Sequence, residues 1–147
     1  MKKILLFLLA ISFATLLKAQ STESQQAAQQ TVTKLFDALS NRDSVSLKKY
    51  CTDDIALYEY GMAWNMDSLI NRAIRLNTSA DFKRTNALDF INTTVNKDVA
   101  WTTYYLHSEI TKDAKLVSIQ WLETVVLVKE RKRWKIKVLH SSLIKRS

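Results

Sequence analysis

Three side chains in the second half of the chain could transfer protons: His140, Glu123 and Asp89. A neutral imidazole can act as a general base near pH 7. A carboxyl group among apolar neighbours has its pKa raised by desolvation, and such a carboxyl can move protons. Each residue also has a structural interpretation, as a hydrogen-bonded core histidine or as a carboxylate that is ion-paired or exposed near the end of a strand. The sequence alone leaves both interpretations open.

The segment that holds His140, residues 133–144, has the alternating pattern of a β-strand, in which successive side chains point to opposite faces. One face would carry an apolar series that ends in polar groups: Trp134, Ile136, Val138, His140 and Ser142. That gradient is typical of a cavity wall, and it predicts that His140 points into a pocket. The lysines of the other face and the basic turn at 131–133 are interpreted as a solvated edge, which discourages strand aggregation.

Glu123 and Asp89 both lie in strand-like segments among apolar residues. Glu123 would share a strand face with Trp121 and Val125. Asp89 would lie near Ile91 in the preceding part of the chain. Desolvation on such a face would raise the pKa of either carboxyl group unless a cation pairs with it.

Aromatic residues supply most of the candidate ligand contacts. Those of residues 58–64 could line the entrance of a pocket or pack as its lid. The segment 99–111 is apolar on both faces, and strand parity does not decide which face is concave. A sheet that is apolar on both faces predicts that the second face is covered too, for instance in a homodimer. The candidate ligand contacts are Tyr58, Tyr60, Trp64, Trp101, Tyr105, Trp121, Trp134 and Ser142.

The elements that must position these residues follow from periodicity. Val32, Leu35, Phe36 and Leu39 have helical spacing, and two shorter helical segments follow, one after Asp43 or Ser44 and one capped by Asp67. A strand over 55–61 separates the two shorter helices. Short polar turns then join four segments rich in β-branched and aromatic residues, which predicts antiparallel hairpins. The four segments are 82–95, 99–111, 115–129 and 133–144. The fold class is therefore α+β, a curved antiparallel sheet wrapped around three N-terminal helices.

Three stretches carry a resemblance to a known family: LFDALSNRDSVSLKKYCTDDIALYEYG, NKDVAWTTYYL and ETVVLVKERKRWKIKVLHSS. In order and spacing they resemble the opening helices, a central strand and the closing hairpin of the nuclear transport factor 2-like, or SnoaL-like, cone fold. The resemblance covers about residues 29–144. It implies a conical cavity between the sheet and the helices. One departure is the last hairpin turn, where Arg131-Lys132 replaces the family's frequent Asp-Gly, so the turn is either wider or strained.

Members of this family include ketosteroid isomerases, polyketide cyclases, epoxide hydrolases and dehydratases, and others only bind or assemble. A fold alone does not decide the chemistry. Tyr58, Asp89 and Tyr105 could fill an isomerase's acid, base and oxyanion-donor roles by residue type. Their register is not matched, so we do not transfer that mechanism.

The first 19 residues have the layout of a secretory signal peptide: a basic start, an apolar stretch and a polar end. We expect cleavage after Ala19, a polar tether over 20–28 and the SnoaL-like domain over 29–146. The alternative is an uncleaved anchor. The protein would be periplasmic or secreted, without a stable membrane anchor after cleavage. Three lysines and no acidic residue lie in residues 1–19, so the formal charge falls from +8 to +5. That charge does not favour a nucleic-acid partner.

The composition argues against several classes of site. The chain has one glycine and no proline, so glycine-rich nucleotide-binding loops are missing. One cysteine allows no internal disulfide, and the two histidines lack metal-binding spacing. We therefore expect neither a cofactor nor a metal.

Three functional hypotheses remain. The first is an exported protein that binds a small, largely apolar molecule in a cavity ending in polar groups, without a defined reaction. The second is a cofactor-free isomerase, dehydratase or hydrolase, which works by general acid and base catalysis. The third is a dimeric assembly module whose cavity is filled by its own side chains. Whether the protein is an enzyme is left open by the sequence.

Overall fold

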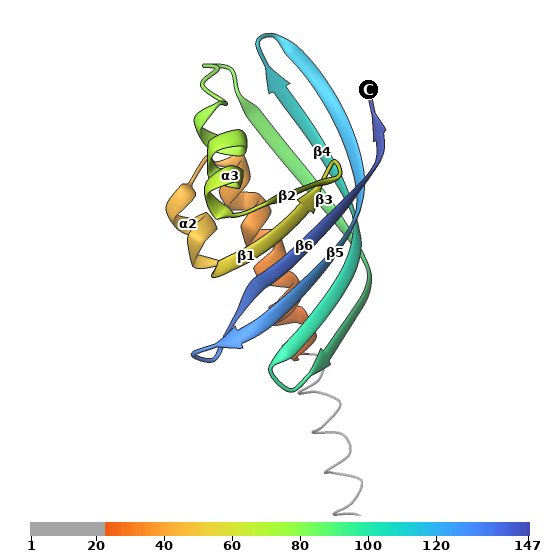
Figure 1. The fold of residues 1–147 in the computed structure, drawn as a ribbon. Helices are drawn as coiled ribbons and strands as arrows, with labels where there is room; N and C mark the ends of the chain where they lie inside the picture. The colour runs from red at the N-terminus through yellow and green to blue at the C-terminus, as the bar shows by residue number, and fades with distance from the viewer. Residues whose placement is uncertain (1–22) are drawn as a thin grey trace, which may run out of the picture.

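The computed structural model describes residues 23–147, and the segment expected to be a signal peptide lies outside them. A single six-stranded sheet has the order β2-β1-β6-β5-β4-β3. The sheet is curved, and the helices lie together on its concave side (Figure 1). The α+β class and the curved, open sheet predicted from the sequence are confirmed.

Three helical segments cover the sheet, as predicted. The first spans residues 23–40. α2 (Ser44–Lys49) is capped at its N-terminus by Asp43, whose side chain accepts hydrogen bonds from two backbone N–H groups. α3 (Met66–Ile70) continues directly into a π-helical turn, η1 (Asn71–Arg75). Asn65 rather than Asp67 caps α3, because the side chain of Asn65 accepts the backbone N–H of Ser68.

The expected polar tether is helical from residue 23 onward, so the prediction of a tether over 20–28 is wrong for residues 23–28. The side chain of Gln25 donates to the backbone carbonyl of Thr93, and Gln29 donates to the Thr93 hydroxyl. Ala28 between them is fully buried. These contacts attach the first turns of the helix to the sheet.

The strands carry the long hairpins expected from the sequence, and a short additional hairpin precedes them. Their bounds are β1 (Cys51–Glu59), β2 (Met62–Trp64), β3 (Lys83–Asn96), β4 (Val99–Lys112), β5 (Lys115–Glu130) and β6 (Arg133–Arg146). Neighbouring strands pair antiparallel except β1 and β6, which are parallel. The parallel pair places β1, which ends at Glu59, beside the C-terminal strand β6.

Irregularities in the pairing change which side chains face the helices. In the β5–β6 ladder the register shifts between the pairs Val126↔Val138 and Leu127↔Ile136, which makes Lys137 an extra residue on β6. A bulge of this kind reverses the alternation of the strand beyond it. As a result Leu139 is buried, whereas His140 is exposed.

The hairpin turns are tight and are made without glycine in three of the four hairpins. Arg131 and Lys132 both have positive φ, 49° and 65°, and so do Asp113 and Ala114. Gly61, with φ 73°, follows Tyr60 in the fourth turn. The last hairpin therefore has a strained two-residue turn and not a wider one.

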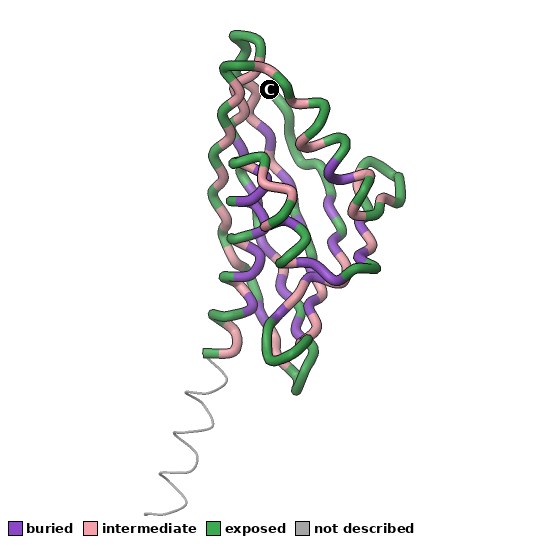
Figure 2. Tube along the Cα trace, turned by 90° about the vertical axis from the view of Figure 1, so that its left-hand side faces the viewer, coloured by how far each residue is buried: buried purple, intermediate pink, exposed green. Residues whose placement is uncertain are grey.

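The buried hydrophobic residues form one core cluster, and the buried positions, purple in Figure 2, lie in the first helix and along the strands. Leu35 of the first helix, Leu47 of α2 and Leu106 of β4 are at most 1% exposed. Within residues 23–147 no helix has the length and apolar character needed to cross a membrane.

Candidate functional site

A cavity of about 180 Å3 lies between the concave face of the sheet and the helices. Apolar side chains line most of it, among them Phe36, Leu106 and Leu139. Seven side chains with polar or charged groups complete the lining: Glu59, Trp64, Arg72, Arg84, Trp121, Glu123 and Ser141. We call this hollow the sheet cavity.

Glu123 is the buried titratable group of the sheet cavity, and 4% of it is exposed. The hydroxyl of Tyr104 donates to Glu123 Oε2 at 2.7 Å, and the hydroxyl of Ser141 donates to Oε1 at 2.6 Å. Burial raises the pKa of Glu123 to about 7, although the two hydroxyls oppose that rise. The carboxyl group can therefore gain or lose a proton near neutral pH.

The strand register explains this triad. Tyr104 and Glu123 are directly opposite each other on β4 and β5, and Glu123 is opposite Ser141 on β6. Side chains of directly paired residues lie about 5 Å apart on the same face. Three neighbouring strands thus bring one carboxyl group and two hydroxyl donors together in the middle of the sheet.

Arg84 of β3 supplies a positive charge on the same face. Its guanidinium donates to Asn86 Oδ1 at 2.9 Å and to the hydroxyl of Ser108 at 3.1 Å. Asn86 in turn donates to the hydroxyl of Ser40 on the first helix. Burial lowers the pKa of Arg84, and the Coulombic attraction of Glu123 counters that shift. The network fixes the guanidinium at the wall of the sheet cavity.

The other side of the cavity carries a second carboxyl group and a second guanidinium. Burial raises the pKa of Glu59 at the end of β1, while Arg84 and Arg72 lower it by Coulombic attraction. The guanidinium carbon of Arg72, in η1, lies 4.8 Å from the centre of the Trp64 ring. The ion pairs within residues 23–147 are Lys135–Glu130 and Lys137–Asp54. The four charged groups of the sheet cavity therefore form no ion pair with one another.

Of the eleven residues proposed from the sequence, three line the sheet cavity: Glu123, Trp64 and Trp121. Of the two interpretations left open for Glu123, the structure agrees with the desolvated one, since the side chain is buried and burial raises its pKa. Six others lie exposed on the convex face of the sheet. These are Tyr58, Asp89, Trp101, Tyr105, His140 and Ser142.

The prediction that His140 points into the pocket is wrong. The extra residue Lys137 on β6 reverses the alternation, so Ser141 occupies the inward position expected for His140. The imidazole instead lies 6.5 Å from the Tyr58 ring, centroid to centroid, on the convex face. Ser142 faces the same way for the same reason. Asp89 is opposite Tyr105 in the β3–β4 ladder, also on the convex face.

The last two of the eleven residues, Tyr60 and Trp134, do not line the sheet cavity. Tyr60 is 47% exposed in the turn between β1 and β2. Trp134 is buried at the other end of β6, where it lines a separate hollow of about 390 Å3. Basic side chains border that hollow: Lys34, Lys49, Lys132 and Arg133.

Several residues of the site were missed by sequence reasoning. Tyr104 could have been found from the register, because a two-residue turn at 113–114 places it opposite Glu123. Ser141 could not, because it reaches its position opposite Glu123 only through the extra residue Lys137 on β6. Arg84 and Arg72 lie in polar stretches and carry no comparable signal. Glu59 was passed over because it stands between two tyrosines in an alternating segment.

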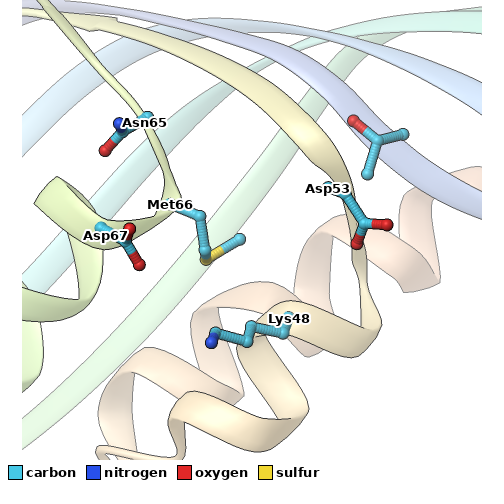
Figure 3. Close-up of a pocket in the computed structure, with 6 residues that line it drawn as sticks. Lys48, Asp53, Asn65, Met66 and Asp67 are labelled. Carbon is cyan, nitrogen blue, oxygen red and sulfur yellow. The ribbon is translucent and has the colours of Figure 1, made fainter.

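A third hollow, of about 220 Å3, lies between α2, the start of β1 and the start of α3 (Figure 3). Lys48, Asp53, Asn65 and Asp67 border it, and all four side chains are exposed. Interactions between solvent-exposed charges are screened by water and contribute little binding energy. We take the sheet cavity as the candidate site because it combines a desolvated carboxyl group with an apolar lining.

No group of three or more metal-binding side chains occurs among residues 23–147. The histidines are both exposed on the sheet, and Cys51 is buried with its pKa raised by burial to about 12.

Comparison with known proteins gives one family and many similar folds. A family model described as a SnoaL-like domain matches residues 28–145. No curated protein sequence matches the chain significantly. A nuclear transport factor 2-like superfamily protein from Salmonella enterica has a TM-score of 0.73 at 15% identity, over 84% of this chain and 93% of that one.

Two further structures illustrate different uses of the fold. A ketosteroid isomerase-like protein from Erwinia carotovora has a TM-score of 0.69 at 16% identity, over 84% of this chain and 98% of that one. The association domain of CaMKII from C. elegans has a TM-score of 0.68 at 16% identity, with the same two coverages. At such identities the likeness shows the shared fold alone.

Proposed function

The chain belongs to the family of SnoaL-like domains, and on that premise we propose that it binds a small, largely apolar molecule in the sheet cavity. The observation that carries this proposal is the cavity itself, a hollow of about 180 Å3 with an apolar lining and a few convergent polar groups. Binding sites for small molecules usually have that composition. The volume lies below the roughly 300–1,000 Å3 that is usual for ligand pockets, so the ligand is small.

Proton transfer by Glu123 is the second candidate function. A carboxyl group with a pKa of about 7 is divided between its acid and base forms at neutral pH, which suits general acid and base catalysis. In its ionised form Glu123 would take a proton from the bound molecule. Returning that proton to another atom would be an isomerisation, and loss of a leaving group instead would be an elimination. The hydroxyls of Tyr104 and Ser141 would hold the carboxyl group in place.

We also propose that the protein is exported and forms a homodimer through the convex face. The sequence of residues 1–19 supports export. Exposed aromatic side chains support the dimer, since Trp101 and Tyr105 of β4 are 40% and 39% exposed on the convex face. Large exposed apolar patches on a folded protein usually mark interaction surfaces.

Native mass spectrometry of the protein purified from its source tests the binding proposal. We expect a retained small molecule in addition to the mass of the chain. Ala73 lines the sheet cavity and Ala63 is exposed on β2, which makes them a matched pair for substitution. Ala73→Phe fills the cavity and should abolish the retained mass, while Ala63→Phe should keep it. Equal retention by both variants would place the molecule elsewhere.

A further inference from the structure

The sheet cavity has more hydrogen-bond donors than the surrounding protein uses. The indole nitrogens of Trp64 and Trp121 are buried, and neither has a hydrogen-bond partner within residues 23–147. Trp121 is only 5% exposed. A buried indole N–H normally finds an acceptor, because a buried donor without one loses its hydrogen bonds to water and gains none in return. Both indoles line the same cavity.

Arg84 adds further unused donors at the cavity wall. A guanidinium has five N–H groups in a planar fork. Two bonds, to Asn86 and Ser108, are its hydrogen bonds within the described part of the chain. Arg84 also has no carboxylate within ion-pairing distance there, since neither of the ion pairs of residues 23–147 includes it. A guanidinium of this kind suits a planar, two-oxygen acceptor.

The acceptors of the cavity do not balance these donors. Glu123 already receives two hydroxyl hydrogen bonds, one on each oxygen. Glu59 is a single carboxyl group, and it lies within the Coulombic influence of both Arg84 and Arg72. Arg72 is exposed to solvent, so Arg84 is the partly buried cation of the cavity, and among residues 23–147 it has no carboxylate at ion-pairing distance.

We propose that the molecule bound in the sheet cavity is a small apolar carboxylate, whose two oxygens accept from the Arg84 guanidinium beside the Trp121 ring. The inference rests on the proposed function, because it assigns a chemical class to the ligand of the same cavity. The carboxylate supplies the acceptors that the donors lack, and its hydrocarbon part lies against Phe36, Leu106 and Leu139. Binding is coupled to proton uptake by Glu123, because a second negative charge nearby favours the neutral form of that carboxyl group.

Other polar groups fit this cavity less well. An ammonium group would face two guanidiniums. A phosphate group would bring nearly two negative charges beside Glu59 and Glu123. A neutral amide or alcohol would supply an acceptor but would leave the Arg84 guanidinium without a counter-charge at ion-pairing distance within residues 23–147. The carboxylate is thus the group that matches both the donor geometry and the charge.

Matched pairs of small molecules test the inference. The panel contains benzoate with benzamide and benzylamine, and isovalerate with isovaleramide and isopentylamine. Binding is measured by titration while the indole N–H signals are followed by 1H–15N NMR, with Trp121→Phe and Trp64→Phe to assign them. We expect at least one carboxylate to bind about tenfold or more tightly than its amide, which corresponds to ~1.4 kcal/mol. The Trp121 indole signal should shift with the carboxylate.

Variants locate the binding group. Arg84→Gln should reduce carboxylate affinity to the level of the amide, and Arg84→Lys should lose most of the preference because an ammonium has no planar fork. Lys83→Gln removes an exposed neighbouring cation from the same strand and should leave the preference unchanged. Amide binding and thermal unfolding of each variant report whether the cavity remains intact.

The outcomes separate this inference from the proposed function. Amides or amines that bind as tightly as the acids would overturn the carboxylate assignment and leave a small-molecule site. A molecule retained from the source that lacks a carboxylate would do the same. If no panel compound binds and the protein from its source retains nothing, both proposals fail.

Discussion

The concave and convex faces of the sheet are built from the same strands, yet their side chains have opposite properties. Tyr104 and Glu123 on the concave face are buried and hydrogen-bonded to each other. Tyr105 and Thr124, the next residues along each strand, are exposed. A shift of one position along a strand therefore decides whether a side chain lies in the desolvated core or in contact with water. A candidate residue of this fold must be assigned to a face before it is assigned a role.

The largest effect should come from placing a charge on each face in turn. Val125 is fully buried, whereas Thr124 is exposed. Val125→Asp would bury a carboxylate without a partner, and we expect it to lower the free energy of unfolding by roughly 4 kcal/mol or more. Thr124→Asp, which removes the hydroxyl contact with Thr103 and a good strand-forming side chain, should lower it by only about 1 kcal/mol. Chemical denaturation measures both, and similar losses would contradict the assignment of the faces.

Glu123 sharpens the comparison through pH. Its pKa is about 7 in the folded protein, against 4.5 as the ordinary value. The folded state therefore holds the proton more tightly, and this contribution to stability is fully present below about pH 4.5. It is lost as the pH rises to about 7 and beyond, by roughly 3 kcal/mol in total at ~1.4 kcal/mol per pKa unit.

The matched variants are Glu123→Gln and Glu109→Gln, because Glu109 is exposed on the convex side of β4. Denaturation curves from pH 4.5 to 8 should lose this pH-dependent component in Glu123→Gln and keep it in Glu109→Gln. A 13C NMR titration of the Glu123 carboxyl group gives its pKa directly. A value near 4.5 would remove the physical basis for proton transfer in the sheet cavity.

The next prediction concerns the convex face, which we expect to be the interface of a homodimer. Trp101 is 40% exposed on β4, and Val126 of β5 is opposite it. If a second copy covers this face, Trp101→Ala should weaken the dimer by about 2 kcal/mol, as a buried aromatic contact does. Glu109→Ala, towards the end of the same strand, serves as the control. Sedimentation equilibrium measures the dissociation constant, and a wild-type protein that stays monomeric at high concentration would exclude the dimer.

Much of the fold was predictable because it follows from local patterns. The helical spacing of Val32 and Leu35 and the two-residue turns between β-rich segments have direct physical causes in burial and chain reversal. Glu123 was also predictable, since its strand has no pairing irregularity that separates it from Trp121 and Val125.

The inward residues of β6 were not predictable from strand parity. Parity assumes an uninterrupted ladder, and the sequence around Lys137 has no glycine or other signal that marks a bulge. The bulge depends on how β6 fits between β1 and β5, which both shift their register against it. Arg84 was missed for a related reason, because its role depends on a contact with Ser108 of the neighbouring strand β4, in addition to Asn86 of its own strand.

The smallest expected effect concerns the turn from which the β5–β6 register starts. Lys132 has φ 65°, a conformation that costs a residue with a side chain about 1 kcal/mol or more relative to glycine. Lys132→Gly should therefore raise the free energy of unfolding by about 1 kcal/mol and leave both faces of the sheet unchanged. Asp98 occupies the second position of the β3–β4 turn without a positive φ, so Asp98→Gly should bring no such gain and should destabilise slightly, because glycine adds freedom to the unfolded chain. Thermal unfolding of the two variants measures the difference. Equal changes in both would mean that the strain of the Arg131–Lys132 turn does not limit the stability of the β5–β6 hairpin.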